Sequence, residues 1–192
     1  MIYPNSNKTY KKKISHANRG INLEEIINDA NKYYLDNDIA IIYKKPTPIG
    51  VVEVSGDKSI ITKAYFKEPS TLDYIGIFKG KYIEFDAKQT INQTSFPLSN
   101  IKESQIEHMR RIVDHGGITF LIIQINNDNY IYMGEDLLSF LDNNKRRSLP
   151  YNLIKNKGYL IKKGDNLIII DYIKTLTSII GGTYEKTKTT KT

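Results

Sequence analysis

The stretch that decides the fold is residues 71–88, which read TLDYIGIF (71–78), KG (79–80) and KYIEFDAK (81–88). The two longer segments have the β-branched and aromatic content of strands, and the Lys-Gly pair between them suits a tight turn. Apolar and charged residues alternate along the second segment, so its charged side chains share one face of the predicted hairpin. They are Glu84, Asp86 and Lys88. We expect Asp73, on the first strand, to lie within reach of this face.

Two acids and a lysine held together by two strands suit the hydrolysis of a phosphodiester. Asp73 and Asp86 can hold a hard divalent cation such as Mg²⁺. Such an ion lowers the pKa of a bound water and neutralises charge that builds up at phosphorus, and the Lys88 ammonium can stabilise the same charge. The alternative is the solvated face of an exposed hairpin, which is what a charged alternation usually indicates. The pattern alone leaves both interpretations open.

A second cluster of candidate residues lies on a predicted helix after the hairpin. Asn100 and Glu103 have the spacing of a capping box, which predicts a helix that runs to about His115. Gln105 falls on the apolar stripe of this helix, and a buried amide without partners is unfavourable by about 1–3 kcal/mol. Gln105 is therefore either bonded to backbone at the helix edge or placed at the metal site, as a ligand or behind one.

Eight blocks of the chain resemble, in order and spacing, the signature blocks of the RecU-type Holliday junction resolvases, which belong to the restriction-endonuclease-like nuclease superfamily. The blocks are NRGINLE (18–24), KKPTP (44–48), AYFK (64–67), TLDY (71–74), IEFDAK (83–88), FPL (96–98), QIEHM (105–109) and HGG (115–117). They span the chain from residue 18 to about residue 172. The resemblance implies an α/β nuclease core, with a central mixed sheet flanked by helices and a projecting stalk hairpin.

The resemblance also implies which residues act. The metal ligands are Thr71, Asp73, Asp86 and Gln105, the ion is Mg²⁺ with Mn²⁺ as a substitute, and the catalytic residues are Asp73, Asp86 and Lys88. The family usually has Asp where this chain has Glu84 and Glu where it has Asp86, so the two acids are exchanged and the Asp86 side chain is one methylene shorter. Glu84 and Glu24 are candidate accessory acids, although Glu24 also suits a surface acid at a helix N-terminus.

Residues 46–66 are the candidate stalk. Prolines stand at its root, strands are expected at 51–54 and 60–62, and the turn is SGDK (55–58). In the resembled family this hairpin enters the open centre of a four-way junction. The residues expected to contact DNA are Arg19, Lys45, Lys58, Lys63, Tyr65 and Phe66. The alternative is an ordinary hairpin with Tyr65 and Phe66 in the core.

The rest of the chain predicts a single domain. Asn22 is expected to cap a first helix, strands are expected at 39–43, 118–125 and 130–133, a helix at 135–143, and an extended cover at 150–161. The nuclease domain is placed at residues 18–180. A flexible basic arm precedes it (1–17), and a disordered Thr- and Lys-rich tail follows it (181–192).

Composition restricts the classes of function. The 192 residues carry 28 Lys and Arg against 21 Asp and Glu, and the formal charge of +7 suits a polyanionic partner. The lack of cysteine excludes disulfides and zinc–thiolate sites. Apolar runs are too short to span a membrane, there is no secretory signal, and no glycine-rich phosphate loop predicts a nucleotide cofactor. We expect a cytoplasmic protein.

These observations predict a Mg²⁺-dependent endonuclease that resolves Holliday junctions in DNA recombination and repair. Paired symmetric nicks would leave 5′-phosphate and 3′-hydroxyl ends. A junction has two equivalent strands to cut, so a homodimer with two-fold symmetry fits it, and the resemblance adds a recombinase as a further partner. Two alternatives stay open: a related endonuclease that acts on linear or flapped DNA, and a non-catalytic module that only binds junctions.

Overall fold

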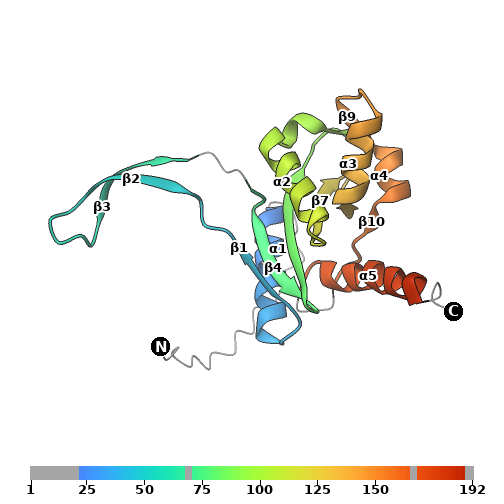
Figure 1. Ribbon diagram of the computed structural model, residues 1–192, viewed down its shortest axis with the longest axis horizontal. Helices are drawn as coiled ribbons and strands as arrows, with labels where there is room; N and C mark the ends of the chain where they lie inside the picture. The colour runs from blue at the N-terminus through green and yellow to red at the C-terminus, as the bar shows by residue number, and fades with distance from the viewer. Residues whose placement is uncertain (1–21, 68–70, 165–167, 189–192) are drawn as a thin grey trace.

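A six-stranded mixed sheet forms the centre of the computed structural model, which describes residues 22–67, 71–164 and 168–188, with side chains up to Gly181 (Figure 1). The strand order is β1-β4-β5-β7-β8-β10. The strands are β1 (Ile41–Lys44), β4 (Tyr74–Phe78), β5 (Lys81–Gln89), β7 (Ile118–Ile125), β8 (Asp128–Met133) and β10 (Tyr159–Leu160). Neighbours run antiparallel except β5 and β7, which are parallel. The predicted α/β class with a mixed sheet is confirmed.

Helices cover both faces of this sheet. One face packs against α1 (Leu23–Asp36) and α5 (Tyr172–Lys188), and the other packs against α2 (Glu103–Asp114), α3 (Gly134–Asn143) and α4 (Tyr151–Lys157). A small two-stranded sheet, β6 (Ser95–Pro97) with β9 (Ser148–Pro150), lies on the second side, next to the 3-10 helix η1 (Leu98–Asn100). The alternation along β5 therefore sends Ile83 and Phe85 into the core beside α1 and α5, and Glu84 and Asp86 to the face that α2 covers.

The predicted hairpin is β4 and β5, and it lies inside the sheet. Lys79 and Gly80 both have positive φ, 49° and 73°, as a two-residue hairpin turn requires. Phe85 of β5 stacks on Tyr74 and on Phe120, with ring centroids 4.8 and 4.6 Å away. On the opposite face Glu84 and Asp86 have no exposed surface. The interpretation of their face as solvated is therefore wrong, because α2 covers it.

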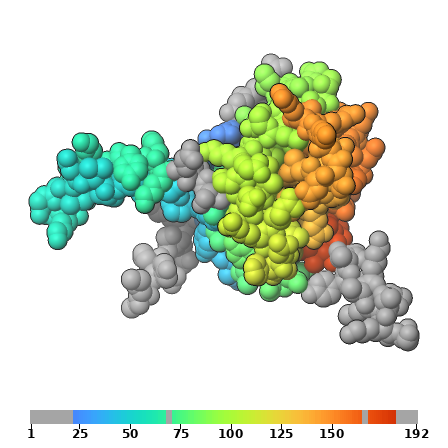
Figure 2. Space-filling view, turned by 45° about the horizontal axis from the view of Figure 1, so that its top comes forward, coloured from blue at the N-terminus to red at the C-terminus, as the bar shows by residue number. Residues whose placement is uncertain are grey.

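The candidate stalk is a separate two-stranded sheet that projects from the body, β2 (Ile49–Val54) with β3 (Ile61–Phe66) (Figures 1 and 2). Tyr65 is 58% exposed and Phe66 is 82% exposed. The alternative that put these two aromatic side chains in the core is therefore wrong. The Tyr65 ring lies over Gly50 of the paired strand, where a Cβ atom would come within 2.3 Å of the ring.

Several strand ends shift by one to four residues, and three further differences from the sequence-based prediction concern helices. Helix α2 starts at Glu103 with Lys102 as its N-cap, because Asn100 belongs to η1. Residues 150–161 are not simply extended, since Ile154 is fully buried in the core and draws 151–157 into helix α4. Helix α5 continues to Lys188, past Gly181, where the tail was predicted to begin; adding residues to an existing helix costs much less than starting one.

Two other predictions are confirmed, and others concern residues outside the described ranges. Asn22 caps α1 by accepting a hydrogen bond from the Glu24 N–H, and β7 has the predicted limits. The basic arm and Arg19 lie outside the described residues. Within the described part of the chain, no helix combines the length and the apolar character that crossing a bilayer needs.

We predict that Phe85→Ala lowers the free energy of unfolding by about 3–5 kcal/mol, because it removes the ring between Tyr74 and Phe120 and leaves a cavity. Urea unfolding followed by circular dichroism measures the change. Phe66→Ala is the matched control, and its exposed ring predicts a change within about 0.5 kcal/mol. Equal losses in the two variants would contradict the assignment of the core.

Candidate active site

Asp73 and Asp86 form a carboxylate pair at the start of β4. The β4–β5 register pairs Tyr74 with Phe85, and one further step places Asp73 opposite Asp86. Asp86 is fully buried, and the Asp73 carboxyl is within hydrogen-bonding reach of it. Burial, followed by the charge of Asp86 and the hydrogen bond to it, raises the pKa of Asp73, while Lys88 and Lys44 oppose this shift. Two acids thirteen positions apart in the chain are thus brought together.

Lys88 completes the predicted catalytic set. Its Nζ lies 2.8 Å from Asp86 Oδ2, and its side chain is 21% exposed whereas that of Asp86 is not exposed at all. The structure therefore brings Asp73, Asp86 and Lys88 together, with the ammonium at the accessible rim. The β4–β5 pairing ends at Tyr74 and does not place Thr71, whose role as a metal ligand stays a prediction.

Gln105 holds the Asp86 carboxylate in place. Its Nε2 donates to Asp86 Oδ2 at 2.8 Å, while the Ala87 N–H donates to Asp86 Oδ1 at 2.8 Å. The Gln105 oxygen accepts from the Lys102 N–H at 3.2 Å and so caps α2. The backbone bond at the helix edge that was weighed from the sequence is present, and the second bond is to Asp86, which is a predicted ligand. In this arrangement the amide nitrogen, not the oxygen, faces the acids.

The donor set fits a magnesium ion. In the described ranges no three Asp, Glu, His or Cys side chains gather where they could hold a metal, and the site offers two carboxylates, Asp73 and Asp86. Mg²⁺ is commonly bound by one or two carboxylates and completes its shell with waters and substrate phosphate oxygens. A cation between two like charges also relieves the repulsion that raises the pKa of Asp73.

Glu84 faces a different set of partners. It is fully buried and accepts hydrogen bonds from Lys45 Nζ, the Tyr82 hydroxyl, His108 Nε2 at 2.9 Å and the Leu72 N–H at 3.2 Å. Burial raises the pKa of Glu84, but the bonds from Lys45, Tyr82 and His108 outweigh it and lower the pKa. The carboxylate is ionised and fully engaged. Its bond to Leu72 fixes the segment that carries Asp73.

The sequence patterns did not single out three further residues that lie at the site, Tyr82, His108 and Lys44. Tyr82 stands two residues from Glu84 on the same strand face, and His108 stands three residues after Gln105 on the same helix face, so both spacings carried a signal. Lys44 donates to the predicted accessory acid Glu24 and also lowers the pKa of Asp73. Glu24 is therefore one ion pair away from the site, at the N-terminal turn of α1.

The residues predicted to contact DNA fall into two groups. Tyr65 and Phe66 are exposed on the stalk, Lys58 lies in its turn with φ 60°, and Lys63 is also exposed, 3.9 Å from Glu53. Lys45 differs, because its ammonium is bound to Glu84 and its N–H donates to the Asp73 carbonyl at 2.7 Å. Lys45 thus joins the stalk root to the carboxylate pair.

We predict that Asp73→Asn raises the melting temperature of metal-free protein at pH 7 by about 1–3 °C. A carboxyl whose pKa is raised by folding removes stability as pH rises through the window above its unfolded pKa, and Asn cannot ionise. The gain should vanish below about pH 4. Mg²⁺ should raise the melting temperature of wild type but not of Asp73→Asn; equal responses to Mg²⁺ would contradict a site at Asp73.

We also predict strong coupling between Lys45 and Glu84. Lys45→Met or Glu84→Gln alone should each lower the free energy of unfolding by about 3 kcal/mol, since each leaves one buried partner uncompensated. The double variant should lose less than the sum, with a coupling of about 1–3 kcal/mol in urea unfolding.

The exposed pair Lys63 and Glu53 is the matched control for that cycle, and its coupling should stay below about 0.5 kcal/mol. Additive losses for Lys45 and Glu84 would show that the buried contact does not hold the stalk root.

Comparison with known proteins identifies the family. A sequence model of the family described as "Recombination protein U" matches residues 18–178. A relative from Oceanobacillus iheyensis, named "Holliday junction resolvase RecU", is 44% identical over 168 residues, 81% of this chain and 86% of its own length. Relatives of the same name from Bacillus cytotoxicus and Limosilactobacillus fermentum are 43% and 41% identical; each alignment covers 90% of this chain, and 90% and 85% of the relative. The resemblance seen in the sequence blocks is confirmed, and the chain belongs to the RecU family of recombination proteins.

Proposed function

We propose that this protein is a structure-specific endonuclease that resolves four-way DNA junctions by hydrolysing phosphodiester bonds. The observation that carries the proposal is the Asp73–Asp86 pair with the Lys88 ammonium 2.8 Å from Asp86. Membership of the RecU family supplies the substrate, because relatives at 41–44% identity are named as Holliday junction resolvases. The paired nicks leave 5′-phosphate and 3′-hydroxyl ends.

The residues divide the work as follows. Asp73 and Asp86 hold Mg²⁺, or Mn²⁺ in its place, with the Thr71 hydroxyl as a neutral oxygen donor. The ion supplies Lewis-acid polarisation of the phosphate and a lowered pKa for the attacking water. Gln105 and the Ala87 N–H keep the Asp86 carboxylate in one orientation. Lys88 places its ammonium against a non-bridging phosphate oxygen and stabilises the charge that grows there in the transition state.

The stalk is the element we propose for junction recognition. Tyr65 and Phe66 expose aromatic rings on which unstacked bases at a branch point can lie. Lys58 and Lys63 stand on the same hairpin and offer ammonium groups to the backbone phosphates. Arg19 adds a further cation near the start of the matched region. Lys45 acts at the stalk root, through its bond to Glu84.

The symmetry of the substrate supports a homodimer. Two strands of like polarity must be cut at equivalent places in a junction, and a two-fold dimer presents two identical sites with the matching relation. Recombination intermediates lie on the chromosome, so the proposal includes a cytoplasmic location and a recombinase that acts on the same DNA as a further partner.

We predict that Lys88→Ala slows junction cleavage by about 100-fold or more, while junction affinity changes little. Asp73→Ala should abolish cleavage in the same assay, and a chelator should do so in wild type. The assay uses a synthetic mobile junction and gel mobility for binding. Lys155→Ala, an exposed lysine on α4, is the control and should cut like wild type.

The same assay separates the alternatives. Equal cleavage rates on the junction and on its component duplexes would favour an endonuclease for linear DNA. Tight junction binding by wild type without any cutting in Mg²⁺ or Mn²⁺ would favour the non-catalytic module. Unchanged cutting by both Lys88→Ala and Asp73→Ala would refute the site.

A further inference from the structure

A groove of about 730 Å³ opens at the end of the catalytic strand. It is bounded by the loop after β5, the turn between β7 and β8, and the segment that leads into α2. Seven of its eleven lining residues are Asn or Gln, and none is charged. Gln89, which follows Lys88 directly, forms one wall. The chain carries a formal charge of +7, yet this groove at the end of β5 is lined by neutral amides.

Some of these amides build the walls of the groove. Asn126 Nδ2 donates to the Gln93 carbonyl at 2.9 Å and joins the two loops. Asn92 Oδ1 accepts from the N–H and the hydroxyl of Thr94, both at 3.0 Å. Gln124 Nε2 donates to Asn129 Oδ1 at 3.1 Å. The groove is therefore held in shape by bonds among its own loops.

Other amides are left for a ligand. Gln89, Gln93, Asn100 and Asn127 are exposed, and within the described part of the chain their side chains make no hydrogen bond. Each presents a donor and an acceptor side by side to the open groove. These four residues come from three separate segments of the chain, and all of them line the same groove.

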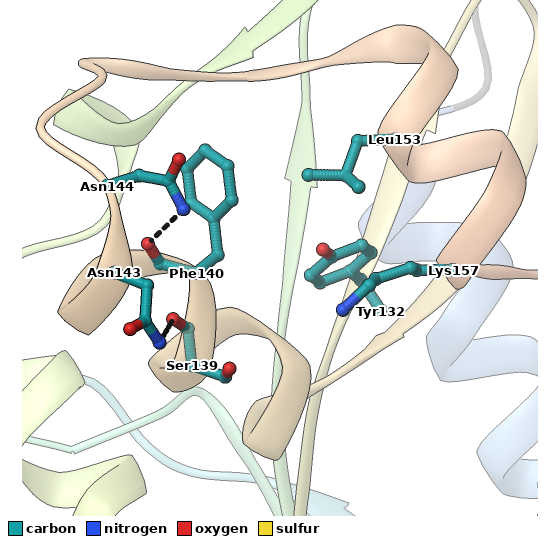
Figure 3. A pocket seen from close by; sticks show the side chains of 7 residues that line it. All are labelled: Tyr132, Ser139, Phe140, Asn143, Asn144, Leu153 and Lys157. Carbon is teal, nitrogen blue, oxygen red and sulfur yellow. Dashed lines mark hydrogen bonds between the residues drawn. The ribbon is translucent and has the colours of Figure 1, made fainter.

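In a different cavity, by contrast, the lining Asn side chains are used in hydrogen bonds to the backbone. Asn143 and Asn144 line a cavity of about 310 Å³ between α3 and α4, and their Nδ2 atoms donate to the carbonyls of Ser139 and Phe140 (Figure 3). Those two amides close the last turn of α3. The free amides of the groove have no such structural task.

Ile91 adds an apolar contact at the rim. It follows β5 by two residues, lines the groove and is fully exposed, more than any other large hydrophobic side chain in the described ranges. Apolar side chains at protein–DNA interfaces pack against bases or insert between base steps. An aliphatic side chain among amides suits the face of a nucleobase better than a phosphate.

The chemistry of the groove matches base edges. Asn and Gln can form paired hydrogen bonds with a base edge, as with N6 and N7 of adenine. A groove that binds phosphates gains its affinity from Lys and Arg, and none lines this one. The carboxyl ends of parallel strands, here β5 and β7, are also where open α/β sheets bind ligands.

We propose that this groove takes the nucleobases next to the scissile phosphate and sets the sequence preference of cleavage. Gln89, Gln93, Asn100 and Asn127 read the base edges, and Ile91 packs against an unstacked base. The inference rests on the proposed endonuclease function, because it needs the scissile phosphate to lie at Lys88.

The test maps cleavage positions on a mobile junction whose branch point migrates through many base steps. Wild type should cut at a subset of steps. Gln89→Ala and Asn100→Ala should each lower the ratio of cutting at preferred and disfavoured steps by roughly 5-fold to 100-fold, as the loss of one paired contact implies. Ile91→Ala should slow cutting at the preferred steps. Asn156→Ala, an exposed amide on α4, is the control and should keep the wild-type pattern.

The outcomes separate this inference from the function on which it rests. If wild type does not cut the junction, the proposed function fails. If wild type cuts but the groove variants keep its pattern, or if wild type cuts every step equally, the groove inference is overturned and the function stands. A uniform loss at all steps, in variants with wild-type melting temperatures, also overturns the groove inference.

Discussion

The structure depends on the burial of two carboxylates, Glu84 and Asp86, on the central strand β5. Both are fully buried two residues apart on one face. Burying an ionised carboxylate without partners is strongly unfavourable, so each has its own cation, Lys45 for Glu84 and Lys88 for Asp86. Helix α2 supplies one further polar partner to each of them, His108 and Gln105. The position of α2 on the sheet is thus tied to the charges beneath it.

The two acids differ in the groups that surround them, and only Asp86 faces a second carboxyl group. Glu84 accepts hydrogen bonds from four donors, and one of them, the Lys45 ammonium, compensates its negative charge. Asp86 has Asp73 opposite it, a second negative group that raises the electrostatic cost. The longer Glu84 reaches partners on α2 and at the stalk root, while the shorter Asp86 keeps its carboxylate close to β5, where the Ala87 N–H and Gln105 hold it.

The local parts of the fold were predictable from the sequence, and the long-range contacts were not. The alternation in 81–88 and the Lys-Gly turn predicted β4 and β5, and Asn22 predicted the start of α1, because these signals lie within a few residues. Asn100 misled as a cap, since η1 uses it and Gln105 closes α2 on Lys102 instead. The network at Glu84 joins residues 39 and 24 positions away in the chain, and periodicity carries no information about partners at that separation.

The stalk is anchored to the body of the protein at its root, close to the carboxylate pair. A lone hairpin is only marginally stable in water, and this one exposes most of its side chains on both faces. Its anchorage comes from the end next to the body, where the Lys67 N–H donates to the Pro48 carbonyl at 2.9 Å. One step closer to the body, Lys45 binds Glu84 with its side chain and the Asp73 carbonyl with its backbone. Lys45, at the stalk root, therefore binds one of the two buried acids and the backbone of Asp73, so the position of the stalk root is coupled to that of the carboxylate pair.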